Sequence, residues 1–177
     1  MRVLGAVLLL LVAWPAAAQE ARVTIVEYGL YTADTVRTEH MSNGFDTNVV
    51  RNICHVATTA DVPARLGVQF GFRFRVEGMP SGAAVQLRRV TRFPTPRKPP
   101  DAPAPVSTSE DMFTVQSGSI SYVGFGFDHT WEVAPGPWAL ELWQADRLLA
   151  QKKFDIGNAI PEEESRSKDN CFQVSSL

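Results

Sequence analysis

The sequence predicts an all-β protein with the architecture of an immunoglobulin-like antiparallel β-sandwich of about seven to eight strands. Apolar and polar residues alternate in several short segments, whereas the spacing of an amphipathic helix is nearly absent after residue 20. Turns rich in glycine and proline separate these segments at intervals typical of a sandwich. A closed barrel is the competing architecture, because it produces the same alternation.

The first two expected strands are RVTIVEYGLY (22–31) and TNVVRNICHVATT (47–59). Both are rich in β-branched residues, which fit a pleated surface. Gly29 interrupts the first segment, and a glycine within a strand marks a bulge or the close approach of another backbone.

The clearest alternation lies in VQFGFRFRVE (68–77). One face carries its apolar residues, which are Val68, Phe70, Phe72, Phe74 and Val76. Successive side chains of a strand point to opposite faces, so this face is expected to join the core while the other meets water. We expect the three phenylalanines to face Trp138 and Leu140 of a later strand.

After the turn GMPSG, a strand resumes in AAVQLRRVTRF (83–93). Its outward residues Arg88 and Arg92 could form a basic stripe with Arg73 and Arg75 of the preceding strand, and this stripe could bind an acidic partner. A solvated sheet face that discourages edge pairing is the favoured interpretation.

The stretch FPTPRKPPDAPAP (93–105) contains six prolines, all within residues 94–105. Proline lacks the amide donor, so this segment cannot be a central strand and is expected to be an extended loop outside the sandwich that folding does not require. A docking surface for a partner is the functional interpretation, and a simple crossover between sheets is the structural one.

The last three expected strands lie in residues 119–128, 138–144 and 148–156. The first has Phe125 and Phe127 on one face, and we expect another group to cover the glycines of its opposite face closely. The other two form a hairpin whose apolar residues also alternate.

A corner in FDHTWEVAPGPWALELW (127–143) joins two of these strands. Trp138 is expected to lock the corner, with its indole N–H donating to a backbone carbonyl. Asp128 is expected to accept backbone amides of the turn. His129 and Glu132 lie in the same corner, which therefore resembles an active site more than any other part of the chain.

A catalytic interpretation lacks the necessary partners. Asp128 and His129 are adjacent, and adjacent side chains on a strand point to opposite faces. No G-x-S-x-G motif occurs, and the three histidines, His40, His55 and His129, lack the spacing of a metal motif. The glycines of GFGF (124–127) do not open a nucleotide-binding helix. We therefore expect no catalytic residue, no metal ligand and no cofactor.

Residues 1–18 have the pattern of a cleaved signal peptide. Arg2 precedes a short apolar run, and Ala16–Ala18 provide a small-residue cleavage site. The run is shorter than the about 20 residues that span a bilayer, so no transmembrane anchor is expected after cleavage. The protein should therefore be located in the periplasm or secreted.

The mature chain is expected to form one domain (19–160) followed by a polar C-terminal tail (161–177). Without Arg2, 16 of the 17 Lys and Arg residues remain against 19 Asp and Glu residues, a formal charge of −3. This balance does not favour binding to nucleic acid or to an anionic membrane surface.

Only two cysteines occur, Cys54 and Cys171. An even number of cysteines in an exported chain favours a disulfide. Two free thiols are the alternative.

Four stretches, VEYGLY, VPARLGVQFGFRFRVEGMPSG, FDHTWEVAPGPWALELW and KKFDIG, occur in this order. In this respect the chain resembles a bacterial exported family known as domain of unknown function 3859, over nearly all of residues 22–157. The resemblance implies no activity and no site residue. The two cysteines are not part of the family pattern.

These observations favour a non-enzymatic binding or accessory module for an envelope protein or another envelope component. The proline-rich segment would contact that partner. The alternative is a hydrolase that acts on an envelope polymer, with Asp128, His129 and Glu132 near its site.

Overall fold

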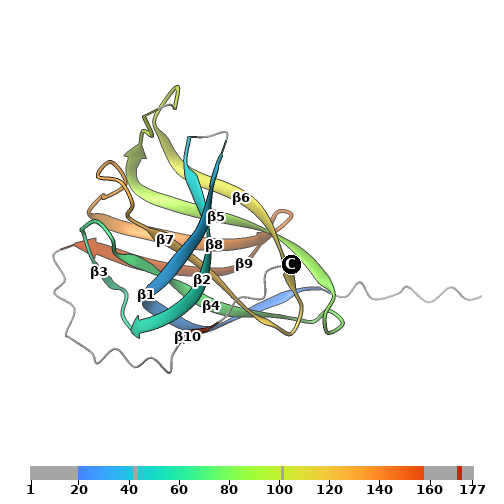
Figure 1. Cartoon of the computed structure of the whole chain (residues 1–177). Coiled ribbons are helices and arrows are strands. Elements are labelled where there is room, and N and C mark those ends of the chain that lie inside the picture. Colours follow the sequence, from blue (N-terminus) through green and yellow to red (C-terminus); the bar gives the residue numbers. More distant parts are fainter. Residues whose placement is uncertain (1–19, 42–43, 101, 158–170, 173–177) are drawn as a thin grey trace, which may run out of the picture.

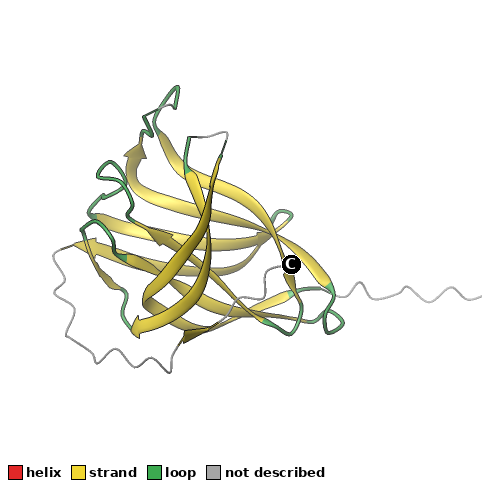
Figure 2. Cartoon of the chain, viewed as in Figure 1, coloured by secondary structure: helices red, strands yellow, loops and turns green. Residues whose placement is uncertain are grey.

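The computed structural model describes residues 20–41, 44–100, 102–157 and 171–172 of this chain. Within these residues the chain forms strands and loops and no helix (Figure 2). No part of the described chain could therefore cross a membrane as a long apolar helix. The strands are β1 (Arg22–His40), β2 (Asp46–Ala57), β3 (Asp61–Pro63), β4 (Gln69–Glu77), β5 (Ala84–Arg97), β6 (Val106–Gln116), β7 (Ile120–Gly126), β8 (Gly136–Gln144), β9 (Arg147–Gly157) and β10 (Cys171–Phe172).

The strands form two five-stranded sheets (Figure 1). The first sheet has the order β10-β2-β1-β4-β7, and the second has the order β3-β9-β8-β5-β6. The predicted β-sandwich is confirmed, although the described chain has ten strands rather than seven or eight. One pairing departs from the predicted antiparallel arrangement, since β3 runs parallel to β9.

The core lies between the sheets, where the predicted phenylalanine face meets β8. Phe70, Phe72 and Phe74 are all fully buried. The Phe70 ring lies edge-on to Trp138, with 5.9 Å between ring centroids, and Leu140 belongs to the same buried cluster. The predicted inward face of β4 is therefore confirmed.

Strand β1 is longer than the sequence predicted, because it continues beyond Tyr31. Its first half pairs with β4 as far as Tyr31, and its second half pairs only with β2. We call the resulting hairpin the β1–β2 arm (residues 32–41 and 44–54). In Figure 1 the arm extends away from the first sheet toward the hairpin formed by β5 and β6.

The proline-rich segment was expected to lie outside the fold. This prediction is wrong for part of the segment. Pro94 and Pro96 extend β5, beyond the residues at which β5 pairs with β8. Pro99 and Ala102 are buried, and both pack against Gly44 at the tip of the β1–β2 arm. Proline is tolerated in this part of β5 because no neighbouring strand requires its missing amide.

Strand β6, which forms the edge of the second sheet, was not predicted from the sequence. This strand pairs with β5 over Val106–Gln116, and its exposure alternates along most of its length. On one face of β6, the alternate positions carry Ser109, Asp111, Phe113 and Val115. Only the last two of these residues are apolar. A polar series of this kind is not recognised as the inward face of a strand.

The short strand β10 pairs with β2 and places Cys171 directly opposite Cys54 in an antiparallel register. The described part of the chain contains no free cysteine. The predicted signal peptide (1–18) and the polar segment 161–170 of the predicted tail lie outside the described residues.

We expect Phe72→Ala to destabilise the protein by about 3–5 kcal/mol, because it leaves a cavity at a fully buried position between the sheets. Urea denaturation of the mature chain measures the change in the free energy of unfolding. Met112→Ala is the control, since Met112 is 54% exposed on β6 and its loss should change stability by less than about 0.5 kcal/mol. Equal effects of the two substitutions would contradict the assigned core.

Candidate functional site

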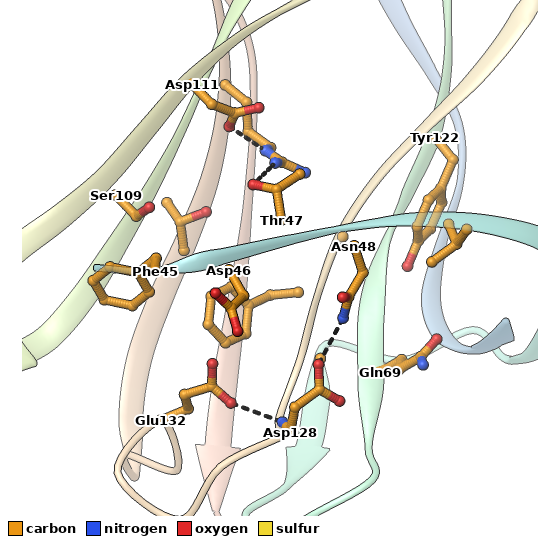
Figure 3. Close-up of a pocket in the computed structure, with 16 residues that line it drawn as sticks. Phe45, Asp46, Thr47, Asn48, Gln69, Ser109, Asp111, Tyr122, Asp128 and Glu132 are labelled. Atoms are coloured by element: carbon orange, nitrogen blue, oxygen red, sulfur yellow. Dashed lines mark hydrogen bonds and ion pairs between the residues drawn. The ribbon is translucent and has the colours of Figure 1, made fainter. Parts of the chain in front are cut away.

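A cavity of about 130 Å³ lies where the β1–β2 arm faces strands of both sheets. Figure 3 shows side chains from β2, β4, β6, β7 and the β7–β8 corner around it. Many of the lining side chains are polar, and they include Asp46, Asn48, Arg89, Asp111, Asp128 and Glu132. The cavity therefore differs in character from the apolar core beside it.

Two cross-strand pairs form the wall contributed by the second sheet. Arg89 of β5 lies opposite Asp111 of β6, and Thr91 lies opposite Ser109. Arg89 Nε donates to Asp111 Oδ1 at 2.7 Å, and the two side chains are only 21% and 19% exposed. These positions continue the inward phase of Leu87, so polar groups replace the apolar residues that a sandwich core would normally contain.

The facing wall comes from the arm. Asn48 Nδ2 donates to Asp128 Oδ2 at 2.7 Å, and this bond joins β2 to the β7–β8 corner. Thr47 Oγ1 accepts a longer hydrogen bond of 3.4 Å from Arg89 Nη2, which joins β2 to the second sheet. The arm is thus tied to both sides of the cavity by polar contacts.

Aromatic packing holds the tip of the arm in place. The Phe45 ring is stacked on Phe93 with 5.2 Å between centroids and lies edge-on to Trp131 at 5.1 Å. Phe45 is 2% exposed, so the arm buries a large apolar side chain at this end of the sandwich. Stacked and edge-on aromatic pairs of this kind stabilise beyond their buried area.

Glycines of the first sheet provide a close-fitting floor beside the cavity. A Cβ atom at Gly124 would overlap the hydroxyl oxygen of Tyr122, and one at Gly71 would lie only 2.9 Å from the same atom. The predicted close cover of Gly124 is therefore confirmed, and the covering group is Tyr122. Burial raises the pKa of the Tyr122 hydroxyl, so this group stays protonated.

Glu132 organises the corner between β7 and β8. Its Oε2 atom accepts backbone N–H groups of Asp128 and His129, both at 2.7 Å. The side chain is buried at 5% exposure. Burial raises the pKa of the Glu132 carboxyl above its ordinary value, and the two backbone hydrogen bonds act in the opposite direction.

The role predicted for Asp128 is therefore wrong, because Glu132 accepts the amides of the turn. Asp128 instead binds the arm through Asn48, a contact across 80 residues that the local sequence cannot reveal. The prediction for Trp138 is confirmed, since its indole Nε1 donates to the backbone oxygen of Ala134 at 2.8 Å.

His129 does not join Asp128 and Glu132 in the lining of the cavity. Its side chain is half exposed and stacks on Trp131, with 5.9 Å between centroids. Its Nε2 atom lies 3.9 Å from Asp46 Oδ2. The three residues of the hydrolase interpretation are thus brought near one another, but no nucleophile is hydrogen-bonded to the histidine among the described residues.

A second polar cluster lies on the face of the first sheet that points away from the phenylalanines. Glu27 lies at its centre, with Arg73 Nη1 3.1 Å away and the Tyr31 hydroxyl donating at 3.1 Å. His55 Nδ1 lies 3.6 Å from the same carboxylate. These groups contact one another, so this cluster connects β1, β2 and β4.

The basic stripe, which was the less favoured interpretation of these arginines, does not form, because β4 and β5 belong to different sheets. Arg73 pairs with Glu27, Arg88 pairs with Glu110 at 2.7 Å, and Arg92 Nε binds Glu141 at 2.7 Å. Within the described part of the chain, no three His, Cys, Asp or Glu side chains are close enough to hold a metal ion.

The sequence prediction missed the polar wall of the cavity, although the strand itself was predicted. In VQLRRVTRF (85–93), the inward positions begin with Val85 and Leu87 and end with Phe93. Between them, the polar residues Arg89 and Thr91 occupy the same face. An interruption at inward positions is the pattern that could have located the site, because functional sites often break the local pattern of a fold.

Comparison with known proteins supports the fold. A sequence profile described as "Domain of unknown function (DUF3859)" matches residues 19–156. An immunoglobulin-like protein from Pseudomonas aeruginosa, known from a crystal structure, is 28% identical in sequence with a TM-score of 0.57. The similarity covers 80% of this chain and 100% of that chain, so the two share one architecture.

A weaker similarity links the chain to the alkylpurine DNA glycosylase AlkC of Pseudomonas fluorescens. The identity is 16%, the TM-score is 0.36, and the similarity covers 60% of this chain and 30% of that one. This similarity is too low to support an inference. No curated protein matches the sequence significantly.

We expect Glu132→Ala to destabilise the protein by about 1–3 kcal/mol, because two partly buried amides lose their acceptor. Glu132→Gln should retain most of the stability, since its amide oxygen can accept both bonds. Denaturation by urea compares the variants with Glu110→Ala, which removes only an exposed ion pair.

The same variants test the charge of Glu132. A raised pKa means that the folded state holds the proton more tightly than the unfolded state does. Stability of the natural protein should therefore fall as pH rises from the ordinary glutamate pKa through the raised value, and Glu132→Gln should lack this decline. Parallel profiles for the two proteins would contradict the assignment.

Proposed function

We propose that this chain, which belongs to the DUF3859 family of domains of unknown function, is a non-enzymatic binding module of the bacterial cell envelope. The observation that carries the proposal is the cavity, with polar side chains at inward positions of β5 and β6. Desolvating such groups costs stability, and apolar residues of similar volume would be neutral or more stable. A cavity kept polar at this cost is best explained by a ligand or a partner side chain that enters it.

The proline-rich segment provides the surface beside this site. Pro99 packs on Gly44, and the adjacent Phe45 lines the cavity. Pro96, Pro100 and Pro103 of the same segment are exposed. An envelope partner would therefore contact the proline-rich segment while one of its groups occupies the cavity.

A hydrolase is the alternative function. Asp128 and Glu132 both line the cavity, which is the observation that favours it. However, Glu132 Oε2 is committed to two backbone amides, and Asp128 is bound to Asn48. Both carboxylates therefore have structural partners, and the binding function is preferred.

A location in the periplasm or outside the cell is part of the proposal. Its supports are the signal-peptide pattern in residues 1–18 and the register that places Cys171 opposite Cys54. Directly opposed residues of antiparallel strands have Cα atoms about 4.5–5.5 Å apart, a separation that a disulfide accommodates. We therefore propose that the two cysteines form a disulfide in the exported chain.

Mass spectrometry of protein exported with its own leader tests this location and the disulfide together. We expect a mature N-terminus at Gln19 and, after alkylation without reduction, no label on Cys54 or Cys171. Protein retained in the cytoplasm should take the label at both positions, because that compartment keeps thiols reduced. Full labelling of folded, exported protein would exclude the bond.

Site-specific photo-crosslinking in cells tests the binding function. A photoreactive residue at Ser109 or Gln69, which line the cavity, should form a defined adduct in the exported protein. The control is Met112, which lies on the same strand as Ser109 but is 54% exposed and does not line the cavity. The proposal fails if both cavity positions give no adduct in protein whose thermal unfolding is unchanged, or if Met112 gives the same adducts.

A further inference from the structure

We propose that the cavity accepts an organic cation, either an ammonium or a guanidinium group. This inference names the chemistry of the ligand and rests on the proposed binding function.

The charges around the cavity are unequal. Four carboxylates line it, and the single lysine or arginine of the lining is Arg89. Arg89 is paired with Asp111 at 2.7 Å, so it neutralises only that carboxylate. Asp46, Asp128 and Glu132 remain, and they come from the arm and from the β7–β8 corner. Figure 3 shows Asp46 and Glu132 on one side of Asp128, whose carboxylate is turned toward Asn48.

Glu132 and Asp128 each have a carboxylate oxygen that could accept a further hydrogen bond. Glu132 is 5% exposed, and both of its hydrogen bonds are made by Oε2, so Oε1 has no hydrogen-bond partner among the described residues. Asp128 accepts from Asn48 through Oδ2 alone. An N–H donor of a ligand in the cavity could bond to these two carboxylate oxygens.

Two histidines contact Asp46. His40 Nδ1 lies 2.5 Å from Asp46 Oδ1, and His129 Nε2 lies 3.9 Å from Asp46 Oδ2. The two imidazoles are 86% and 50% exposed, so they stand at the outer side of the site. Neither histidine lines the cavity, which leaves the inner carboxylate oxygens of the corner to the ligand.

The spacing of these groups favours an organic cation over a metal ion. Among the described side chains, no three carboxylates or histidines approach closely enough to form a metal site. An ammonium group carries three N–H donors and a guanidinium group carries five, and both can bridge acceptors that lie further apart. The donors of the ligand would therefore complement carboxylates that a compact metal ion cannot reach together.

The size and the other walls of the cavity agree with a head group on a short stem. A volume of about 130 Å³ is close to the about 150 Å³ that holds one benzene molecule. Phe45, Phe125 and Tyr122 line the same cavity and can pack against methylene groups. Such a ligand could be a free amine or a lysine or arginine side chain of the envelope partner.

NMR titration of the isotope-labelled mature chain provides the test. The probes are butylammonium, butylguanidinium and the neutral isostere n-butanol, together with short peptides that contain lysine or norleucine. We expect saturable shifts of the Asp128 and His129 amides, which donate to Glu132, with the cationic probes and not with the neutral ones. Tighter binding of the lysine peptide would indicate a partner side chain, and tighter binding of butylammonium would indicate a free amine.

Asp128→Asn keeps the size of the side chain and an acceptor for Asn48, and it should weaken binding of the cations about tenfold or more. The matched control is Asp34→Asn, because Asp34 also accepts from an asparagine, Asn52, at 2.7 Å but does not line the cavity. Glu132→Gln provides a second variant with the same expected loss if Asp128→Asn does not fold.

The inference is overturned if n-butanol binds as tightly as butylammonium, or if Asp128→Asn and Asp34→Asn behave alike. It also fails, without loss of the proposed function, if the cations do not bind while adducts at Ser109 persist in cells. Absence of adducts at the cavity positions would instead refute the binding function itself.

Discussion

The contact between the phenylalanine face of β4 and Trp138 of β8 determines how the two sheets meet. Phe70, Phe72 and Phe74 are fully buried, and Trp138 contacts aromatic rings from β4, β5 and β7. Because Trp138 also binds the Ala134 carbonyl, its ring fixes the end of the β7–β8 corner as well as the distance between sheets. The position of Glu132 and of the neighbouring cavity therefore depends on this aromatic contact.

The concentration of apolar contacts at this core allows the adjoining region to be polar. Phe45 extends the aromatic packing to the tip of the arm through Phe93 and Trp131, so the arm is anchored by apolar burial at its end. The Asn48–Asp128 and Arg89–Thr47 bonds then need only fix the orientation of the arm over the cavity. Burial of aromatic surface contributes most of the stabilisation here, while individual hydrogen bonds contribute about 0.5–1.5 kcal/mol each.

The sequence was sufficient for the features that depend on local periodicity. The alternation of β4 identified its inward face, and the proline-glycine corner identified the role of Trp138. It was insufficient wherever a residue is used by a distant segment. Asp128 was assigned to its own turn because no local pattern indicates Asn48, and the outer half of β1 was missed because it packs only through its partner β2. Strand β6 was missed because its inward positions carry the polar residues Ser109 and Asp111. Their partners are Thr91 and Arg89 of β5, and this pairing cannot be seen in the sequence of β6 alone.

The Glu27 cluster and the polar cavity differ in how their carboxylates are paired. Around Glu27, the single carboxylate has three partners, which are Arg73, Tyr31 and His55. Around the cavity, the one arginine of the lining pairs with one of four carboxylates, and both hydrogen bonds to Glu132 are accepted by Oε2. In a cluster that serves only the fold, carboxylates can be paired internally, as Glu27 is. The cavity has more carboxylates than cationic partners, and its volume is large enough for a small ligand. For this reason we assign binding to the cavity and not to the Glu27 cluster on the sheet face.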